Sequence, residues 1–179
     1  VQPAPRAPNH VLNRRTHFAL TGLPPEPNST FRNPHSTLEK LLASPRYGEH
    51  WARHWPDVAR YADNKGYVFF EENTFPWAWT YRDYVIRSLN ADKPFDRFLI
   101  EPLAGDEVDA ATTENILATG ITRPGLWADE PPDLAVARFD PLDDIVNTTS
   151  QACLVLTTGC ARCHDPKLAP SLHTDSYSM

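Results

Sequence analysis

Three residues near the end of the chain have the types and spacing for redox chemistry: Cys160, Cys163 and His164. Two cysteines that are separated by two residues and followed at once by histidine form the attachment motif of c-type haem. The spacing corresponds to one helical turn, so both thiols can reach the vinyl groups of one haem while the imidazole becomes the proximal iron ligand. The motif therefore predicts a single, covalently attached haem c.

Other uses of a paired cysteine motif fit this sequence less well. A structural zinc site needs a second pair of ligands at similar spacing, and the only other cysteine is Cys153. A thioredoxin-like pair follows a strand in a βαβ pattern, whereas the residues before Cys160 have a helical pattern. The remaining alternative is a chance match in a reduced intracellular protein. Because haem c is installed outside the cytoplasmic membrane, we expect a periplasmic or extracellular protein.

The composition limits both the fold and the partners. The chain has 179 residues, of which 41% are hydrophobic, so it can form one domain with a core. Its 18 prolines against seven glycines predict short helices that are joined by stiff, irregular loops. The formal charge of −6 makes nucleic acid an improbable partner. We also expect no transmembrane segment, since no stretch approaches the roughly 18 apolar residues that span a bilayer.

The order of the elements predicts an all-α fold. Residues 1–36 are rich in proline, and we expect an extended arm there, followed by a helical haem c domain with long proline-rich loops over residues 37–179. In the first half of the chain, helices are expected from Ser36 to the residue before Pro45, from Pro45 to Trp55 with a break at Pro56, and over residues 58–62. In the second half, they are expected from Trp79 to Leu89, from Pro94 onward, from Thr112 or Thr113 to Gly120, and from Asp140 or Asp143 to Thr158. Residues 64–78 and 122–139 are expected to be loops.

Several stretches of the chain resemble the planctomycete-type cytochrome c family. They are Leu20–Pro25, Leu41–Glu49, Trp51–Trp55, Asp57–Asp63, Tyr81–Asp83, Leu103–Asp106 and Thr158–Asp165. This resemblance covers nearly the whole chain in order. It implies a secreted, haem-bearing helical module, usually within a longer polypeptide, and supplies no characterised reaction. The chain departs from the family pattern at Pro56, usually an aliphatic residue, and at Pro166, often a second histidine.

The sixth iron ligand is open to several assignments. His54 is the first choice, since it lies among aromatic residues and matches the histidine of the family's Arg-His-Trp motif. Its alternative role is a buried histidine that bonds to backbone or a carboxylate. His173, Met179 and an open sixth position remain as alternatives. The other histidines are expected at the surface: His50 beside the motif, and His10, His17 and His35 in the arm.

Other residues have weaker claims on the haem. Guanidinium groups pair well with carboxylates, so Arg60, Arg82 and Arg162 could bind the haem propionates. Arg60 and Arg82 could equally bridge to nearby aspartates (Asp57, Asp63 or Asp83). Trp55 could line the haem, together with Trp51 and Tyr61, or these aromatics could be plain core. We expect Cys153 to be a small buried hydrophobe, and the acidic pairs Asp129-Glu130 and Asp143-Asp144 to be solvated surface.

The function that these observations favour is electron transfer by a monohaem c-type cytochrome, rather than enzymatic catalysis. Such a protein needs a redox protein partner, or it is a subunit of a larger, membrane-associated periplasmic redox assembly. One alternative is a haem enzyme or gas sensor with an open distal site, such as a peroxidase-like protein. Another is a secreted module in which the haem is mainly structural.

Overall fold

The computed structural model of the chain describes residues 5–29, 31–62, 76–108, 112–122 and 133–179. Within these ranges the chain forms helices and connecting loops and no strands, which confirms the all-α prediction. The elements are α1 (Asn9–Thr21), α2 (Pro34–Leu42), α3 (Pro45–Ala52), α4 (His54–Val58), α5 (Trp79–Asn90), α6 (Phe95–Ala104), α7 (Thr113–Ala118), η1 (Thr119–Thr122), α8 (Leu134–Thr149), η2 (Ser150–Leu154), η3 (Gly159–Arg162) and α9 (His173–Ser176).

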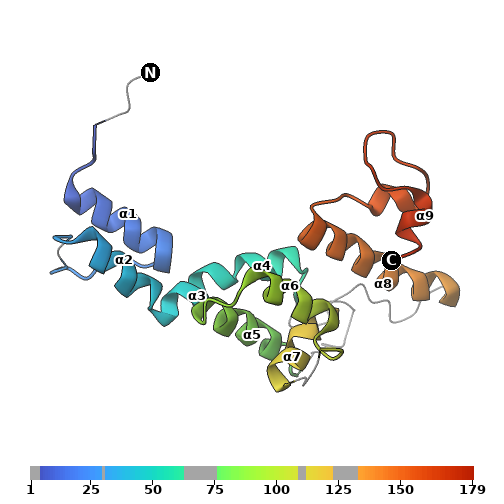
Figure 1. Ribbon diagram of the computed structural model, residues 1–179, viewed down its shortest axis with the longest axis horizontal. Coiled ribbons are helices and arrows are strands. Elements are labelled where there is room, and N and C mark those ends of the chain that lie inside the picture. The colour runs from blue at the N-terminus through green and yellow to red at the C-terminus, as the bar shows by residue number, and fades with distance from the viewer. Residues whose placement is uncertain (1–4, 30, 63–75, 109–111, 123–132) are drawn as a thin grey trace, which may run out of the picture.

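The elements follow one another along the longest axis of the molecule. Figure 1 shows α1 and α2 at one end, α3 to α7 in the middle, and α8 and α9 at the other end. The closest contacts between elements agree with this order, since α3 lies against α1 and α5, and α7 against α5 and α6. No helix in the described ranges is long and apolar enough to cross a bilayer.

The N-terminal arm contains a helix, so the prediction of an extended segment over residues 1–36 is wrong for Asn9–Thr21. The prolines of this segment flank the helix rather than interrupt it, and Pro8 lies directly before its first turn. The helix ends at Gly22, whose φ of 68° permits its N–H to bond the Phe18 carbonyl. The next helix also begins earlier than expected, because Asn33 rather than Ser36 is its N-cap.

The break that Pro56 was expected to cause occurs at Arg53. The helix α3 starts at Pro45 behind the Ser44 cap, as predicted, and ends at Ala52. Pro56 then occupies the first turn of α4, where its missing N–H costs no helical hydrogen bond. After α4, Arg60 has a φ of 56°, and the N–H of Tyr61 donates to the Pro56 carbonyl. This end has the hydrogen-bond pattern of a Schellman motif, with arginine where glycine is usual.

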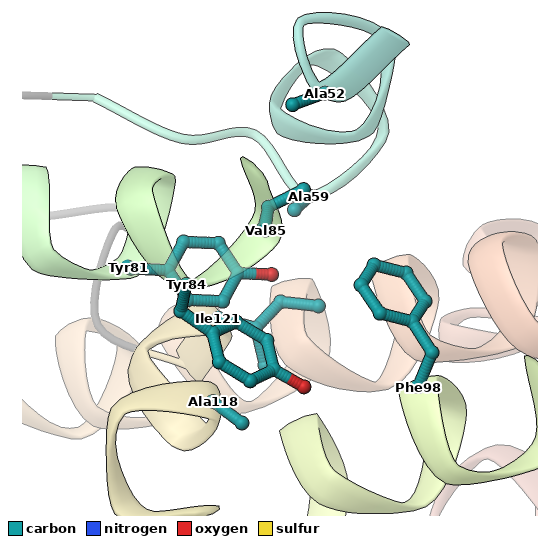
Figure 2. Close-up of a cluster of buried hydrophobic side chains, with 8 residues drawn as sticks. All are labelled: Ala52, Ala59, Tyr81, Tyr84, Val85, Phe98, Ala118 and Ile121. Atoms are coloured by element: carbon teal, nitrogen blue, oxygen red, sulfur yellow. The ribbon is translucent and has the colours of Figure 1, made fainter. Parts of the chain in front are cut away.

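The hydrophobic core surrounds α5, which begins at Trp79 as predicted. Figure 2 shows its buried side chains Tyr81, Tyr84 and Val85 together with Phe98 of α6 and Ile121 of η1. Small buried residues from three further positions let the neighbouring backbones approach these rings: Ala52, Ala59 and Ala118. Tyr84 stacks on Phe98 with ring centroids 6.3 Å apart, which is a favourable arrangement for aromatic pairs.

A buried polar network strengthens this core. The Tyr84 hydroxyl donates to Glu101 Oε2 at 2.9 Å, and Glu101 also binds Lys93, which lies over the Tyr84 ring. Glu101 is only 7% exposed, so its negative charge needs the opposite charge of Lys93 nearby. Nearby, Trp55 Nε1 donates to the Tyr81 hydroxyl at 2.8 Å. These bonds satisfy the polar tips of both buried tyrosines.

The helix α8 starts earlier and ends earlier than the sequence predicted. Asp133, rather than Asp140 or Asp143, caps it by accepting bonds from the N–H groups of Ala135 and Val136. The helix continues through Pro141, which can lie within a helix at the cost of one backbone hydrogen bond. After Thr149 the chain forms the π-helical turn η2, and Val155, with a φ of 56°, ends it before Thr158.

The burial of Tyr81 and Tyr84 predicts that the free energy of unfolding falls at alkaline pH. Burial raises the pKa of Tyr81 to about 12, and burial together with the hydrogen bond to Glu101 also raises the pKa of Tyr84. An unfolded tyrosine loses its proton near pH 10, so the unfolded chain binds fewer protons than the folded one between about pH 10 and 12. Stability should therefore fall as pH rises through this window, by about 1.4 kcal/mol per pH unit for each phenol.

Urea unfolding at a series of pH values, followed by circular dichroism, measures this slope. Tyr81→Phe should make the slope shallower, whereas Tyr177→Phe, at a side chain that is 65% exposed, is the control. Equal slopes for the original protein and Tyr81→Phe would contradict the assignment.

Candidate functional site

The cysteine motif forms one tight turn that begins in η3 and continues to His164. The N–H groups of Cys163 and His164 both donate to the Cys160 carbonyl at 3.3 Å. These bonds keep Cys160, Cys163 and His164 within one turn of the backbone. The intervening Ala161 is fully buried and anchors the turn, whereas both cysteines are exposed and carry free thiols. The donor set is thus accessible to an external group.

The imidazole of His164 is oriented by the backbone next to it. Its Nδ1 lies 3.1 Å from the Asp165 carbonyl oxygen, a distance at which a protonated Nδ1 donates a hydrogen bond. Histidines that bind metals commonly donate one ring N–H to a carbonyl in this way, which fixes the tautomer and leaves the other nitrogen free. Nε2 of His164 is therefore the nitrogen available to a metal.

The short helix α9 and the residue after it form hydrogen bonds to the backbone of the motif. The Arg162 carbonyl accepts hydrogen bonds from His173 Nε2 at 3.0 Å and from the Tyr177 hydroxyl at 3.2 Å. The His173 backbone N–H also donates to Asp165 Oδ1 at 2.7 Å. These bonds fix the backbone on both sides of Cys163 and His164. His173 was expected only as a possible iron ligand, and this positioning contact was not predicted.

Arg162, within the motif, is bound to the side of α8. Its guanidinium lies 2.6 Å from Asp140 Oδ1 and 3.3 Å from Asp143 Oδ2. The hydrogen bond to Asp140, and then the charge of Asp143, raise the pKa of Arg162. The prediction that Asp143 is solvated surface is wrong, because its carboxylate belongs to this bridge. Asp129 and Glu130 lie outside the described residues.

A second arginine binds the middle part of the molecule to the same helix. Arg60, directly after α4, forms an ion pair with Asp144, whose side chain is only 14% exposed. Asp144 is therefore also not solvated surface. Burial lowers the pKa of Arg60, and its Nε atom is buried without a partner among the described residues. Arg82 lies 3.6 Å from Asp83, one of its expected partners.

The residues expected on the distal side of the haem lie elsewhere. His54 is exposed on α4, and its ring lies 5.6 Å from Trp51 and 6.4 Å from His50. Trp55 belongs to the core, with its ring 4.8 Å from Phe98. The described contacts do not bring His54 to His164, so its assignment as sixth ligand stays a prediction.

The remaining histidines and Met179 have defined surroundings. His10 and His35 are exposed, as expected, whereas His17 and His50 are partly buried. Burial lowers the pKa of His50, and the nearby Arg53 and His54 add to this effect. Met179 Sδ accepts a hydrogen bond from Ser150 at 3.6 Å, which places the end of the chain against η2.

One known family matches the whole chain. The family PSCyt2, described as a protein of unknown function (DUF1549), matches residues 1–179. The chain belongs to this family. Its description supports the planctomycete-type resemblance and assigns no activity. No curated protein and no solved structure matches the chain.

The C-terminal lobe of this PSCyt2 chain, residues 133–179, exposes an unusual amount of apolar surface. Leu134, Val155 and Leu168 are 80%, 88% and 95% exposed. Further large apolar side chains of the lobe are exposed as well: Val136, Phe139, Leu142, Leu154, Leu172, Tyr177 and Met179. Exposed apolar side chains can form a binding surface for a ligand or partner where they are contiguous. Among the described residues, no three His, Cys, Asp or Glu converge as metal ligands.

The ion pair between Arg60 and Asp144 predicts a measurable loss of stability. Asp144→Ala leaves the partly buried Arg60 without this carboxylate, which should lower the free energy of unfolding by about 1–3 kcal/mol. Urea unfolding followed by circular dichroism measures the change. Asp106→Ala, at an exposed aspartate, is the matched control. If both variants unfold at the same urea concentration, the pair does not tie α8 to the rest of the fold.

Proposed function

We propose that this PSCyt2 chain is a monohaem c-type cytochrome domain that transfers electrons. Cys160 and Cys163 would hold one haem c through thioether bonds, and His164 would be its proximal ligand. The observation that carries the proposal is the turn itself: it keeps two exposed free thiols within one turn of an imidazole whose Nδ1 is already bonded to a carbonyl. That combination leaves both sulfurs and Nε2 available to the same group.

The residues around the motif fit a haem. When bound, haem c supplies reversible one-electron exchange at its iron. The exposed apolar side chains of the C-terminal lobe could cover a macrocycle and exclude water from it. His173 and Tyr177 would keep the proximal turn rigid through the Arg162 carbonyl. The hydrogen bond from His164 to Asp165 would keep the imidazole ring oriented.

Three further residues were expected to contact the haem, and each already has a partner. Arg162 binds Asp140 and Asp143, and Arg60 binds Asp144. Trp55 donates to Tyr81. If any of these three residues contacted the haem, that residue would have to give up its present partner or bind both. We therefore assign the holding of the haem to Cys160, Cys163 and His164.

The proposal also implies a cell compartment and redox partners for the protein. Because haem c is attached outside the cytoplasmic membrane, the chain would work in the periplasm or outside the cell. A carrier needs a redox protein that donates an electron and another that accepts it, and both could belong to one larger, membrane-associated assembly. Direct electron exchange requires no substrate cavity at the iron, which distinguishes this function from a haem enzyme or gas sensor with an open sixth position.

Optical and electron paramagnetic resonance spectra of the haem-loaded protein test the proposal. We expect a low-spin, six-coordinate haem, a reversible one-electron titration, and no binding of carbon monoxide by the reduced protein. A stable high-spin spectrum with rapid carbon monoxide binding would instead indicate an enzyme or sensor. Unchanged helical structure and partner binding after haem removal would exclude a purely structural role.

Substitution of His54 tests the sixth ligand. His54→Ala should convert the low-spin spectrum to a high-spin one if His54 binds the iron, since a lost axial ligand weakens the ligand field. His50→Ala is the control, because His50 lies on the neighbouring helical turn with a similar environment of aromatic rings. A low-spin spectrum that survives His54→Ala would move the assignment to His173 or Met179.

A further inference from the structure

A pocket of about 500 Å³ lies between the C-terminal end of α1 and the helix α3, toward the end of the molecule that carries α1 (Figure 1). The described residues that line it all lie between Phe18 and Arg53, so the pocket is separate from the cysteine motif. Sites that bind small molecules have volumes of roughly 300–1,000 Å³. This pocket, which we call the arginine pocket, therefore has room for a small molecule.

Gly22 and His50 hold the two sides of the arginine pocket together. Gly22 ends α1 with a φ of 68°, and a Cβ atom at this position would lie 2.5 Å from His50 Nδ1. The imidazole of α3 therefore packs directly against the glycine backbone. A pocket whose sides are already in contact needs little reordering when a ligand binds, which lowers the entropic cost of binding.

The arginine pocket has one positive charge that no described carboxylate compensates. Arg46 lines the pocket and is paired with Glu49 at 2.5 Å. Arg53 lines it as well, and makes no ion pair or hydrogen bond among the described residues. Burial, followed by the charge of Arg53, lowers the pKa of His50, so this imidazole adds no second charge near pH 7. A guanidinium without a partner favours an anionic ligand, and its planar fork matches a carboxylate.

The charge distribution of the chain also favours an anion at this end. Residues 1–53 contain seven Lys and Arg but only three Asp and Glu, although the whole chain has a formal charge of −6. The helix α1 contains Arg14 and Arg15 and no acidic residue. The Arg14 guanidinium lies 5.0 Å from the centre of the Phe18 ring, and Phe18 lines the pocket. An approaching anion therefore meets an excess of positive charge.

Apolar side chains line the pocket as well. Phe18 is 38% exposed and Leu23 is 49% exposed, so both can cover an apolar group of a ligand. The carboxylate of Glu49, which also lines the pocket, would repel a ligand with two negative charges more strongly than a ligand with one. The lining therefore suits a singly charged anion with an apolar part better than it suits phosphate.

We propose that the arginine pocket binds a small organic monocarboxylate that carries one apolar group, such as an aromatic acid. The Arg53 guanidinium donates hydrogen bonds to the carboxylate, and the apolar group lies against Phe18 and Leu23. The volume of the pocket, its uncompensated arginine and its apolar side chains each support this class of ligand.

Calorimetric titration of the haem-loaded full chain with four probes tests this assignment. The probes are benzoate, benzamide, which has the same shape without the charge, acetate, which lacks the ring, and inorganic phosphate. Benzoate should bind about tenfold more tightly than benzamide, the ratio at the lower end for a hydrogen bond to a charged group. Acetate and phosphate should bind more weakly than benzoate. Added salt should reduce the preference for benzoate, because Arg53 is exposed.

Three variants and a control locate the binding. Arg53→Gln should abolish the preference for benzoate and leave benzamide binding unchanged. Glu49→Gln should strengthen benzoate binding severalfold, because it removes a repelling charge and releases Arg46. Leu23→Ser, at an exposed side chain, should weaken benzoate and benzamide alike. Arg97→Gln should change neither affinity, since Arg97 is also exposed without a partner among the described residues but lies outside the pocket.

Several results would overturn the proposal. They are equal affinity for benzoate and benzamide, a preference for benzoate that survives Arg53→Gln, tighter binding of phosphate than of benzoate, and no binding of any probe. Benzoate binding that shifts the haem absorption bands and is insensitive to Arg53→Gln would place the ligand at the iron and also overturn it. None of these results depends on whether the haem serves electron transfer.

Discussion

Three carboxylates on one side of α8 connect the two halves of this structure. Asp144 binds Arg60 at the end of α4, while Asp140 and Asp143 bind Arg162 inside the cysteine motif. The aromatic core and the motif are thus both bound to α8. Close, partly buried ion pairs are screened less by salt than exposed ones. These ion pairs are therefore contacts that hold the motif in position relative to the core.

The two halves differ in how they are stabilised. Around α5, tyrosines, a phenylalanine and small alanines are buried together, and the network of Tyr84, Glu101 and Lys93 satisfies their polar groups. The C-terminal lobe instead exposes much of its apolar surface and holds its motif by hydrogen bonds from α9. A covalently attached haem would supply the missing apolar partner in that lobe. The two halves also meet near Tyr81, whose pKa is affected by Cys153 of η2.

Local sequence patterns predicted the elements that depend on local physics. The Ser44-Pro45 start of α3, the helix near Trp79–Leu89 and the Thr112 cap of α7 follow from capping and periodicity. The prolines misled the prediction of the N-terminal arm, because they flank α1 without preventing it. Pro141 lies within α8, whose start was predicted at Asp140 or Asp143. A helix that is supported by tertiary contacts tolerates one lost hydrogen bond.

The candidate site could be predicted only where its residues are neighbours in the chain. The Cys-x-x-Cys-His spacing is local, and the turn that it predicts is present. The pairing of Arg60 with Asp144 joins residues that are distant in sequence, and no periodic pattern reveals it. Glu101 is similar, because an acidic residue in a helix predicts exposure unless its partners Tyr84 and Lys93 are known.

Mass spectrometry of the chain after expression with a c-type haem maturation system tests the central claim most directly. The account predicts one haem per chain, attached to the peptide that contains Cys160 and Cys163, with no attachment in a Cys160→Ala, Cys163→Ala double variant. A peptide of unmodified mass in a chain that was exported and matured alongside a known c-type cytochrome would contradict it.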